Sequence, residues 1–190
     1  MGETMSCSEE EQKLIEGCKR GDRKAQRELY ERFASKMLVL CKRYMGSQES
    51  AEDVLQDGFV AVFTKLDQYS GAGSFEGWVR KVMVNTALCE LRKNNVMKDA
   101  QDIDSTYEAT QVGITDVLEN LAQKDLLKLV MSMPEGYRAV FNLSVFEGMP
   151  HSQIAKELGI TEANSRSQLS RGKAWLQEKI KKMGLSNGRV

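Results

Sequence analysis

The chain has 190 residues, of which 41% are hydrophobic and 28% charged, and its 27 basic and 27 acidic residues give a formal net charge of zero. This composition excludes disordered and fibrous proteins and predicts a folded globular one. No run reaches about 18 uninterrupted apolar residues, the length of a membrane span, and the first residues are acidic where a secretory signal is basic. We therefore expect a cytoplasmic protein with no membrane insertion.

The first half of the chain has a helical pattern. Apolar residues recur at helical spacing from residue 9 to about residue 95, with breaks at 21–22, 46–47 and 69–74. The pattern predicts about four helices. Their candidate N-caps are Asp22, Ser47 or Ser50, and Ser74. On the third helix the expected inward residues are Val54, Leu55, Gly58, Phe59, Val62 and Leu66.

Residues 96–116 lack a sustained period and are rich in acidic residues, which predicts a flexible acidic linker. Beyond it we expect a helix over about 117–133, then one that starts at Pro134, then a pair of short helices. The inward residues of the Pro134 helix are expected to be Tyr137, Val140, Phe141 and Val145. The fold class is therefore all-α, with two helical domains over residues 9–95 and 117–184, the second a helix-turn-helix.

The helix pair near the carboxyl end has the features of a helix-turn-helix. Gly159 supplies a left-handed turn after an apolar face formed by Ile154, Ala155 and Leu158, and Thr161 caps the second helix. The early residues of such a second helix face base edges in the major groove. Here the candidates are Asn164, Ser165, Arg166, Ser167 and Gln168, followed by Arg171 and Lys173. A solvated amphipathic helix in a bundle is the alternative.

Residues 75–95 combine an aromatic residue with cations and an amide, which is typical of single-stranded DNA binding. The candidates are Trp78, Arg80, Lys81, Asn85, Arg92 and Lys93. In the alternative interpretation Trp78 belongs to the core. The preceding helix gathers acidic residues, namely Glu49, Glu52, Asp53 and Asp57. Without histidines or a second carboxylate helix beside them, these residues favour protein docking over a metal site.

The neutral total hides a segregation of charge along the chain. Basic residues outnumber acidic ones by 15 to 11 over residues 13–96 and by 8 to 3 over residues 151–190, whereas residues 97–127 carry 2 basic and 7 acidic residues. Such segregation indicates a polyanionic partner at both basic regions. We also expect the acidic linker and residues 1–12 to shield the basic regions from stray DNA.

Three stretches, in this order, resemble a known family. They are AEDVLQDGFVAVFTKLDQY, SFEGWVRKVMVNTALCELRKNN and MPEGYRAVFNLSVFEGMPHSQIAKELGITEANSRSQLSRGKAWLQ. Together they resemble regions 2 and 4 of bacterial sigma-70 family factors of the extracytoplasmic function (ECF) group, over nearly the whole chain except its ends and linker. The resemblance implies a transcription initiation factor that binds core RNA polymerase, directs it to promoters and assists DNA melting.

The resemblance also implies roles for individual residues. Asp53, Gln56 and Asp57 match the helix that docks on the clamp helices of the large polymerase subunit. Trp78 and Asn85 match residues that melt and read the minus-10 element, where the loop from Tyr69 to Ser74 helps to hold a flipped base. The residues that would contact the adjacent DNA backbone are Arg80, Lys81, Arg92 and Lys93. The carboxyl-terminal helix would bind the minus-35 element as duplex, and an anti-sigma factor is an implied partner.

The sequence departs from the family pattern in three places. Cys89 replaces a common aspartate, and Gly58 replaces a larger residue. Asn164 and Ser165 stand where many members have threonine followed by valine. A serine at that inward position loses about 1 kcal/mol of the stabilisation that a buried apolar side chain would give. We therefore expect either weaker packing there or a serine turned toward the groove.

Two other function classes remain open at this point. A one-component regulator with a helix-turn-helix would bind DNA without polymerase, and a helical adaptor would bind only proteins. The sequence has no nucleophile and base pair, metal-ligand cluster or phosphate loop, so we expect no enzymatic activity, catalytic residue, metal or cofactor.

Overall fold

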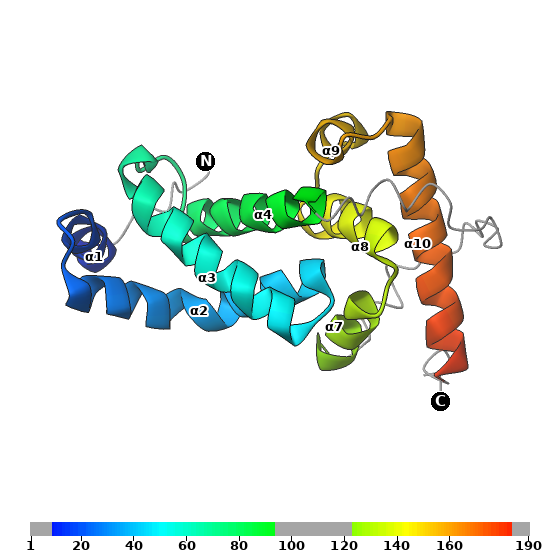
Figure 1. The fold of residues 1–190 in the computed structure, drawn as a ribbon, viewed down its shortest axis with the longest axis horizontal. Helices are drawn as coiled ribbons and strands as arrows, with labels where there is room; N and C mark the ends of the chain where they lie inside the picture. Colours follow the sequence, from blue (N-terminus) through cyan, green and yellow to red (C-terminus); the bar gives the residue numbers. More distant parts are fainter. Residues whose placement is uncertain (1–8, 94–122, 184–190) are drawn as a thin grey trace, which may run out of the picture.

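A computed structural model describes residues 9–93 and 123–183 of the chain. These residues form helices joined by short turns, without a strand among them, which confirms the expected all-α class (Figure 1). None of the described helices combines the length and the apolar character needed to cross a bilayer. The expected linker, residues 96–116, lies outside the described residues.

The amino-terminal lobe, residues 9–93, contains the expected helices. They are α1 (Glu9–Lys19), α2 (Arg23–Met45), α3 (Gln48–Lys65) with a 3-10 turn η1 (Leu66–Gln68), and α4 (Phe75–Lys93). The predicted caps are confirmed: Asp22 accepts from the backbone N–H of Lys24 at 2.8 Å, and Ser47 from that of Ser50 at 3.2 Å. Ser74 likewise accepts from the backbone N–H of Gly77.

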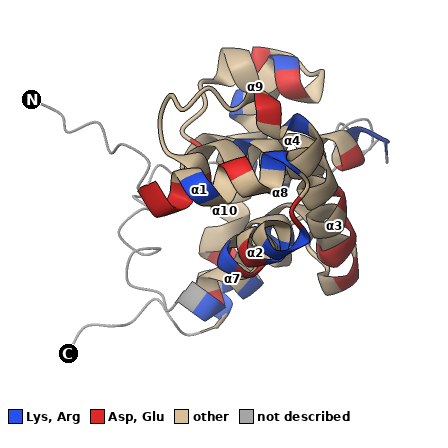
Figure 2. Ribbon diagram, turned by 90° about the vertical axis from the view of Figure 1, so that its left-hand side faces the viewer, with Lys and Arg blue, Asp and Glu red and all other residues tan. Residues whose placement is uncertain are grey.

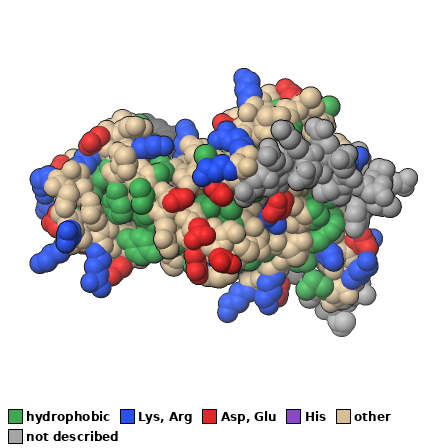
Figure 3. All heavy atoms as spheres, viewed as in Figure 1, with side chains coloured by type: hydrophobic (Ala, Val, Ile, Leu, Met, Phe, Trp, Pro, Cys, Tyr) green, Lys and Arg blue, Asp and Glu red, His purple; other side chains and the backbone are tan. Residues whose placement is uncertain are grey.

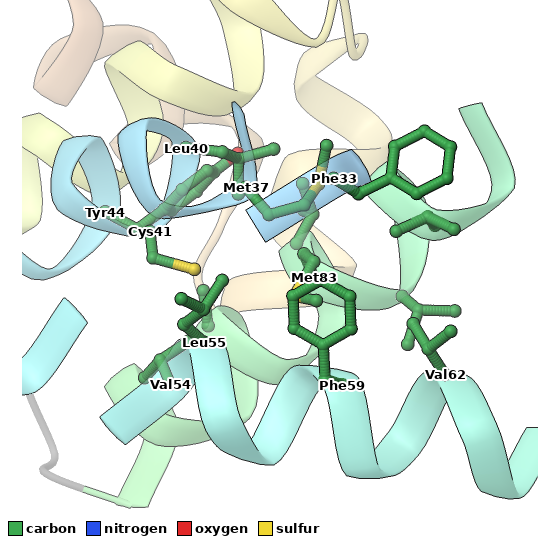
Figure 4. Packing of buried hydrophobic residues seen from close by; sticks show 14 of the residues in the cluster. Phe33, Met37, Leu40, Cys41, Tyr44, Val54, Leu55, Phe59, Val62 and Met83 are labelled. Atoms are coloured by element: carbon green, nitrogen blue, oxygen red, sulfur yellow. The ribbon is translucent and has the colours of Figure 1, made fainter. Parts of the chain in front are cut away.

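The core of this lobe lies where α2, α3 and α4 meet (Figure 4). All the inward residues predicted on α3 and η1 are buried. Gly58 has a packing reason, since a Cβ at this position would collide with the Met83 sulfur. Because α4 fills that space with methionine, α3 carries no side chain there. This departure from the family pattern is therefore a matter of core packing.

The cysteines of this lobe are free thiols with no metal site around them. Cys18 and Cys41 are buried and Cys89 is exposed. Burial raises the pKa of the Cys41 thiol to about 12, which keeps it protonated and unreactive. Within residues 9–93 and 123–183, no three His, Cys, Asp or Glu side chains are placed to hold a metal ion.

The carboxyl-terminal lobe, residues 123–183, contains α7 (Gln123–Met131), α8 (Glu135–Phe141), a π-helical turn η2 (Asn142–Phe146), α9 (His151–Leu158) and α10 (Glu162–Lys182). Its apolar cluster joins Val130, Tyr137, Phe141 and Trp175. The expectation that Val145 faces inward is wrong, because the side chain is 41% exposed. The wider π turn after Phe141 changes the helical register and rotates Val145 outward.

The two lobes pack against each other. Figure 1 shows α7 and α8 beside the carboxyl end of α2, and α9 near the carboxyl end of α4; contacts in each of these helix pairs agree. Residues from α8, η2 and α9 join the apolar cluster of the amino-terminal lobe, namely Ala139, Val140, Leu143, Ile154 and Leu158. The described lobes therefore share part of one core.

Candidate nucleic-acid interface

One side of α4 borders a cavity of about 740 Å³. Trp78, Lys81, Asn85 and Arg92 line it together, so four of the residues expected at the minus-10 element share one concave surface. Trp78 is half-buried and the other three are exposed. The cavity therefore presents an aromatic ring, an amide and cations, which are the groups that bind unstacked bases and phosphates.

Other helices complete the same cavity. Lys65 from the end of α3 and Gln68 from η1 line it, and both are exposed. Sequence analysis missed these two residues, because no periodic pattern shows that the end of α3 lies beside α4. Asp57 from α3 and Glu157 from α9 also reach the lining. The cavity thus collects residues from both lobes.

Trp78 is held in place by two other aromatic rings. Its ring centre lies 5.8 Å from that of Phe75, with planes 17° apart, and 5.7 Å from that of Tyr69. Tyr69 is buried, and its hydroxyl donates to the Gly73 carbonyl at 2.9 Å. Gly73 has a φ of 79°, a conformation that favours glycine. Tyr69, expected to help hold a flipped base, here orients its own loop and supports Trp78.

Arg80 and Lys93 are not part of this cavity lining. Arg80 lines a second cavity, of about 480 Å³ between α2, α4 and α7, and donates twice to the Glu147 carboxylate at 3.0 and 2.7 Å. Hydrogen bonding to Glu147 raises the pKa of Arg80. The exposed Lys93 pairs with Glu90 at 3.0 Å. The structure therefore brings together only part of the expected minus-10 set.

The candidate polymerase-binding residues lie on the outer surface of α3. Asp53, Gln56 and Asp57 are all exposed. Acidic residues run along this helix in Figure 2, and acidic side chains gather over it in the space-filling view of Figure 3. Val60, one turn further on, is 65% exposed. An acidic surface beside an exposed apolar side chain suits a protein partner with basic residues.

The helix-turn-helix elements form as predicted. Gly159 ends α9 in the left-handed conformation, with φ of 67°. Thr161 caps α10 by accepting from the backbone N–H of Asn164 at 3.1 Å. Ile154, Ala155 and Leu158 are buried, as expected of the inner face of α9. Local sequence therefore sets both the turn and the start of the second helix.

Two residues assigned to the minus-35 surface are in the interior instead. Ser165 is fully buried, with its hydroxyl 2.8 Å from Nδ1 of His151 on α9, and Gln168 is 1% exposed. This corrects their placement on the DNA-facing side of α10. The serine occupies the inward position that its spacing predicts, and His151 provides the hydrogen bond that a buried hydroxyl requires.

The other candidates on α10 remain accessible. Arg166 is exposed and pairs with Glu162 one turn earlier at 2.6 Å. The remaining residues, all half-buried, are Asn164, Ser167, Arg171 and Lys173. The accessible surface of α10 therefore carries three cations, an amide and a hydroxyl, all of which can donate hydrogen bonds to bases or phosphates.

Two family profiles match the chain, one on each lobe. The profile described as Sigma-70 region 2 matches residues 29–96, and the profile described as Sigma-70, region 4 matches residues 123–176. Together the two matches span more than half of the chain. They cover both the α3 and α4 surfaces and the helix-turn-helix.

The chain is also similar to curated proteins over most of its length. It is 27% identical over 180 residues to the ECF RNA polymerase sigma-E factor of Haemophilus influenzae, covering 90% of this chain and 95% of that protein. The sigma-E factor of Escherichia coli K12 is 26% identical over 181 residues, covering 90% and 94%. A solved structure of CnrH in complex with the cytosolic domain of CnrY aligns with a TM-score of 0.42 at 21% identity, covering 89% and 96%.

Proposed function

The chain belongs to the sigma-70 family of RNA polymerase sigma factors, in the ECF group, and we propose how its parts divide the work of promoter recognition. As a sigma factor it acts in transcription initiation with core RNA polymerase and promoter DNA, so the one-component regulator is not favoured. Residues 9–95 would bind polymerase and the minus-10 element, and residues 117–184 the minus-35 element. Residues 96–116 would be the linker between these two domains.

The α4 cavity is the proposed site for single-stranded minus-10 DNA, and it is the observation that carries the proposal. Trp78 offers a ring braced by two aromatic neighbours, so it can stack on a base without first ordering itself. Asn85 can read a base edge, while Lys81 and Arg92 neutralise phosphates. We add Lys65 and Gln68 to this site. Capturing bases outside the stack would stabilise the opened strands.

The outer surface of α3 is the proposed polymerase contact. Asp53, Gln56 and Asp57 are exposed there and would dock on the clamp helices of the large subunit, as the family resemblance implies. The exposed Val60 supports the assignment, since an apolar side chain inside a charged rim is a common feature of protein interfaces.

The accessible surface of α10 is the proposed minus-35 contact, bound as duplex in the major groove. The residues proposed to contact DNA are Asn164, Arg166, Ser167, Arg171 and Lys173. Ser165 and Gln168 would act indirectly by packing α10 against its neighbours. We further propose, from the family resemblance, a cytoplasmic location and an anti-sigma factor that holds the protein inactive.

Substituting Trp78 tests the proposed function. Trp78→Ala should leave duplex binding by the holoenzyme intact but reduce strand opening, seen as weaker permanganate footprints on thymines in the minus-10 region. Trp78→Phe is the matched control, because it keeps an aromatic ring and should retain most of the opening. Equal footprints in the wild type and Trp78→Ala would contradict the assignment. Thermal melting of each variant separates loss of DNA opening from loss of folding.

A further inference from the structure

The carboxyl-terminal lobe holds the only histidine of the chain. His151 is the first residue of α9 and is half-buried. Its Nδ1 lies 2.8 Å from the hydroxyl of Ser165, which is fully buried on α10. The two helices of the helix-turn-helix are therefore joined by a hydrogen bond, and Figure 1 shows α9 beside the first turns of α10.

The imidazole ring of His151 is fixed at one nitrogen and open at the other. Nε2 makes no hydrogen bond to a described residue, and it is not among the buried unpartnered atoms of the described residues, so it reaches solvent. A serine hydroxyl can donate to Nδ1 of a neutral ring or accept from Nδ1 of a charged one. Ser165 can therefore hold the ring in one orientation in both states, with Nε2 facing outward.

The position of the ring suits a contact with the DNA backbone. In a helix-turn-helix the second helix enters the major groove while the first helix crosses the backbone. Here the first helix is α9, and Ser165 lies between two residues proposed to contact DNA, Asn164 and Arg166. The ring of His151 therefore lies beside the turn of α10 that would enter the groove. A donor on α9 would meet phosphate oxygens before base edges.

The charged groups around α9 leave this imidazole without an ionic partner. The helix packs against α10, α4 and η2, and none of the described carboxylates forms an ion pair with His151. The charged groups on these elements that have other partners are Glu162 with Arg166, Glu147 with Arg80 and Arg43, and Arg92 with the carbonyl of Glu157. Lys156, on α9 itself, is exposed. An anion at Nε2 would therefore have no carboxylate of the described chain to displace.

From these contacts we propose that His151 is a further DNA contact of the minus-35 surface, in which Nε2 donates to a backbone phosphate and Ser165 is the positioning residue that aims the ring. A phosphate oxygen only accepts hydrogen bonds, so Nε2 carries a proton in the complex. When the ring is charged, the contact becomes an ion pair and strengthens. This inference rests on the proposed function and adds to it a contact made by α9.

The charge of an imidazole makes this contact measurable. Histidine ordinarily changes charge between about pH 5 and about pH 8, whereas carboxylates, lysine and arginine keep their charge in this range. A phosphate binds the charged ring more strongly than the neutral one, so DNA affinity should rise as the pH falls. Because His151 is the only histidine, its substitution removes this response from the chain.

The first test compares DNA affinity at two pH values. The probe is a duplex with a minus-35 element that the full chain, reconstituted with core polymerase, has selected from random DNA. From about pH 7.5 to about pH 5.5 the affinity of the wild-type holoenzyme should rise about three- to fivefold more than that of His151→Gln, which is the upper range for an exposed ion pair. At the lower pH the slope of log affinity against log salt should be steeper by about 0.9 in the wild type, as expected for one more phosphate contact.

A relocated histidine is the matched control. Gln12 is exposed on α1, far from α10 in Figure 1. The double variant His151→Gln with Gln12→His has as many titrating groups as the wild type, but it should respond to pH like His151→Gln alone. A double variant that responds like the wild type would show an effect of net charge and overturn the proposal. A His151→Gln protein that keeps the full wild-type response would overturn it as well.

Ser165→Ala tests the positioning role separately. It should keep the wild-type affinity at about pH 7.5, where an imidazole ordinarily carries little charge, and lose most of the gain at about pH 5.5, because the ring is no longer aimed. A serine that only stabilises the fold would lower the melting temperature and leave the pH response unchanged, which would remove Ser165 from the proposal.

The same experiment distinguishes this inference from the proposed function. If the holoenzyme selects no minus-35 element from random DNA, the proposed function fails, and the contact of His151 fails with it. If Arg171→Ala loses affinity for the selected element while His151→Gln matches the wild type at both pH values, the proposed function stands and only the contact of His151 fails.

Discussion

The two lobes are built on different interiors. In the amino-terminal lobe the buried hydrophobic side chains form one continuous apolar core between α2, α3 and α4. All the buried polar or charged residues in the described part of the chain belong to the carboxyl-terminal lobe, namely Arg138, Asn142, Ser165 and Gln168. The first lobe is therefore stabilised by apolar packing, whereas the second adds buried polar contacts to its apolar packing, some of them made to the first.

This difference fits the two proposed roles. A surface that stacks bases must stay rigid, and the aromatic rings behind Trp78 give it a fixed support. The contact between the lobes, by contrast, uses groups that can return to water, such as the carbonyls that end α2 and accept from Arg138. Polar interfaces between domains are typical of parts that move relative to each other.

The largest effect is expected in the apolar core. Phe75 is fully buried and packs on the rings of Phe33, Tyr69 and Trp78. Phe75→Ala should lower the free energy of unfolding by about 3–5 kcal/mol, from lost burial and a residual cavity, as measured by urea denaturation. The loosened Trp78 should also weaken strand opening. A loss below about 1 kcal/mol would show that this lobe does not depend on its aromatic core.

A smaller effect is expected at Arg138 on α8, whose buried guanidinium donates to the carbonyls of Tyr44 and Met45 at the end of α2. Arg138→Met keeps an unbranched apolar side chain but removes the hydrogen bonds to the end of α2, and should cost about 2–3 kcal/mol. Water can replace the guanidinium at the carbonyls that end α2, so the amino-terminal lobe should lose little stability. We therefore expect the carboxyl-terminal lobe to unfold first. Urea transitions followed by Trp175 fluorescence, in a Trp78→Phe background, should then precede those followed by circular dichroism. Coincident transitions would mean that the lobes unfold as one unit.

The smallest effects are expected on α10. There, two substitutions distinguish a residue that stabilises the helix from one that is proposed to bind DNA. Ser165→Ala should cost about 1 kcal/mol by removing the hydroxyl bonded to His151, while leaving affinity for minus-35 duplex unchanged. Arg171→Ala, on the accessible surface, should do the reverse: stability is kept, and the slope of log affinity against log salt falls by about 1. An Arg171→Ala slope equal to that of the wild type would remove the phosphate contact from the proposal.

Much of this protein follows from local sequence. Asp22, Ser47 and Thr161 were identifiable as caps, and Gly159 as a turn, because each acts on residues within four positions of itself. The inward faces of α3 and α9 follow from helical periodicity for the same reason. The resemblance to the sigma-70 family rests on such local patterns. The two family profiles match the same parts of the chain that carry these patterns, residues 29–96 and 123–176.

Only the tertiary structure decided which residues meet. Arg80 appeared to belong with its helix neighbours, but its partner Glu147 is 67 positions away, and Arg138 lies 94 positions from the carbonyl of Tyr44. Ser165 likewise was recognisable as an unusual inward residue, whereas its bond to His151 required α9 and α10 to be placed in space. Periodicity gives the face of a helix that is buried. The partner on that face depends on long-range packing, which spacing along the chain does not encode.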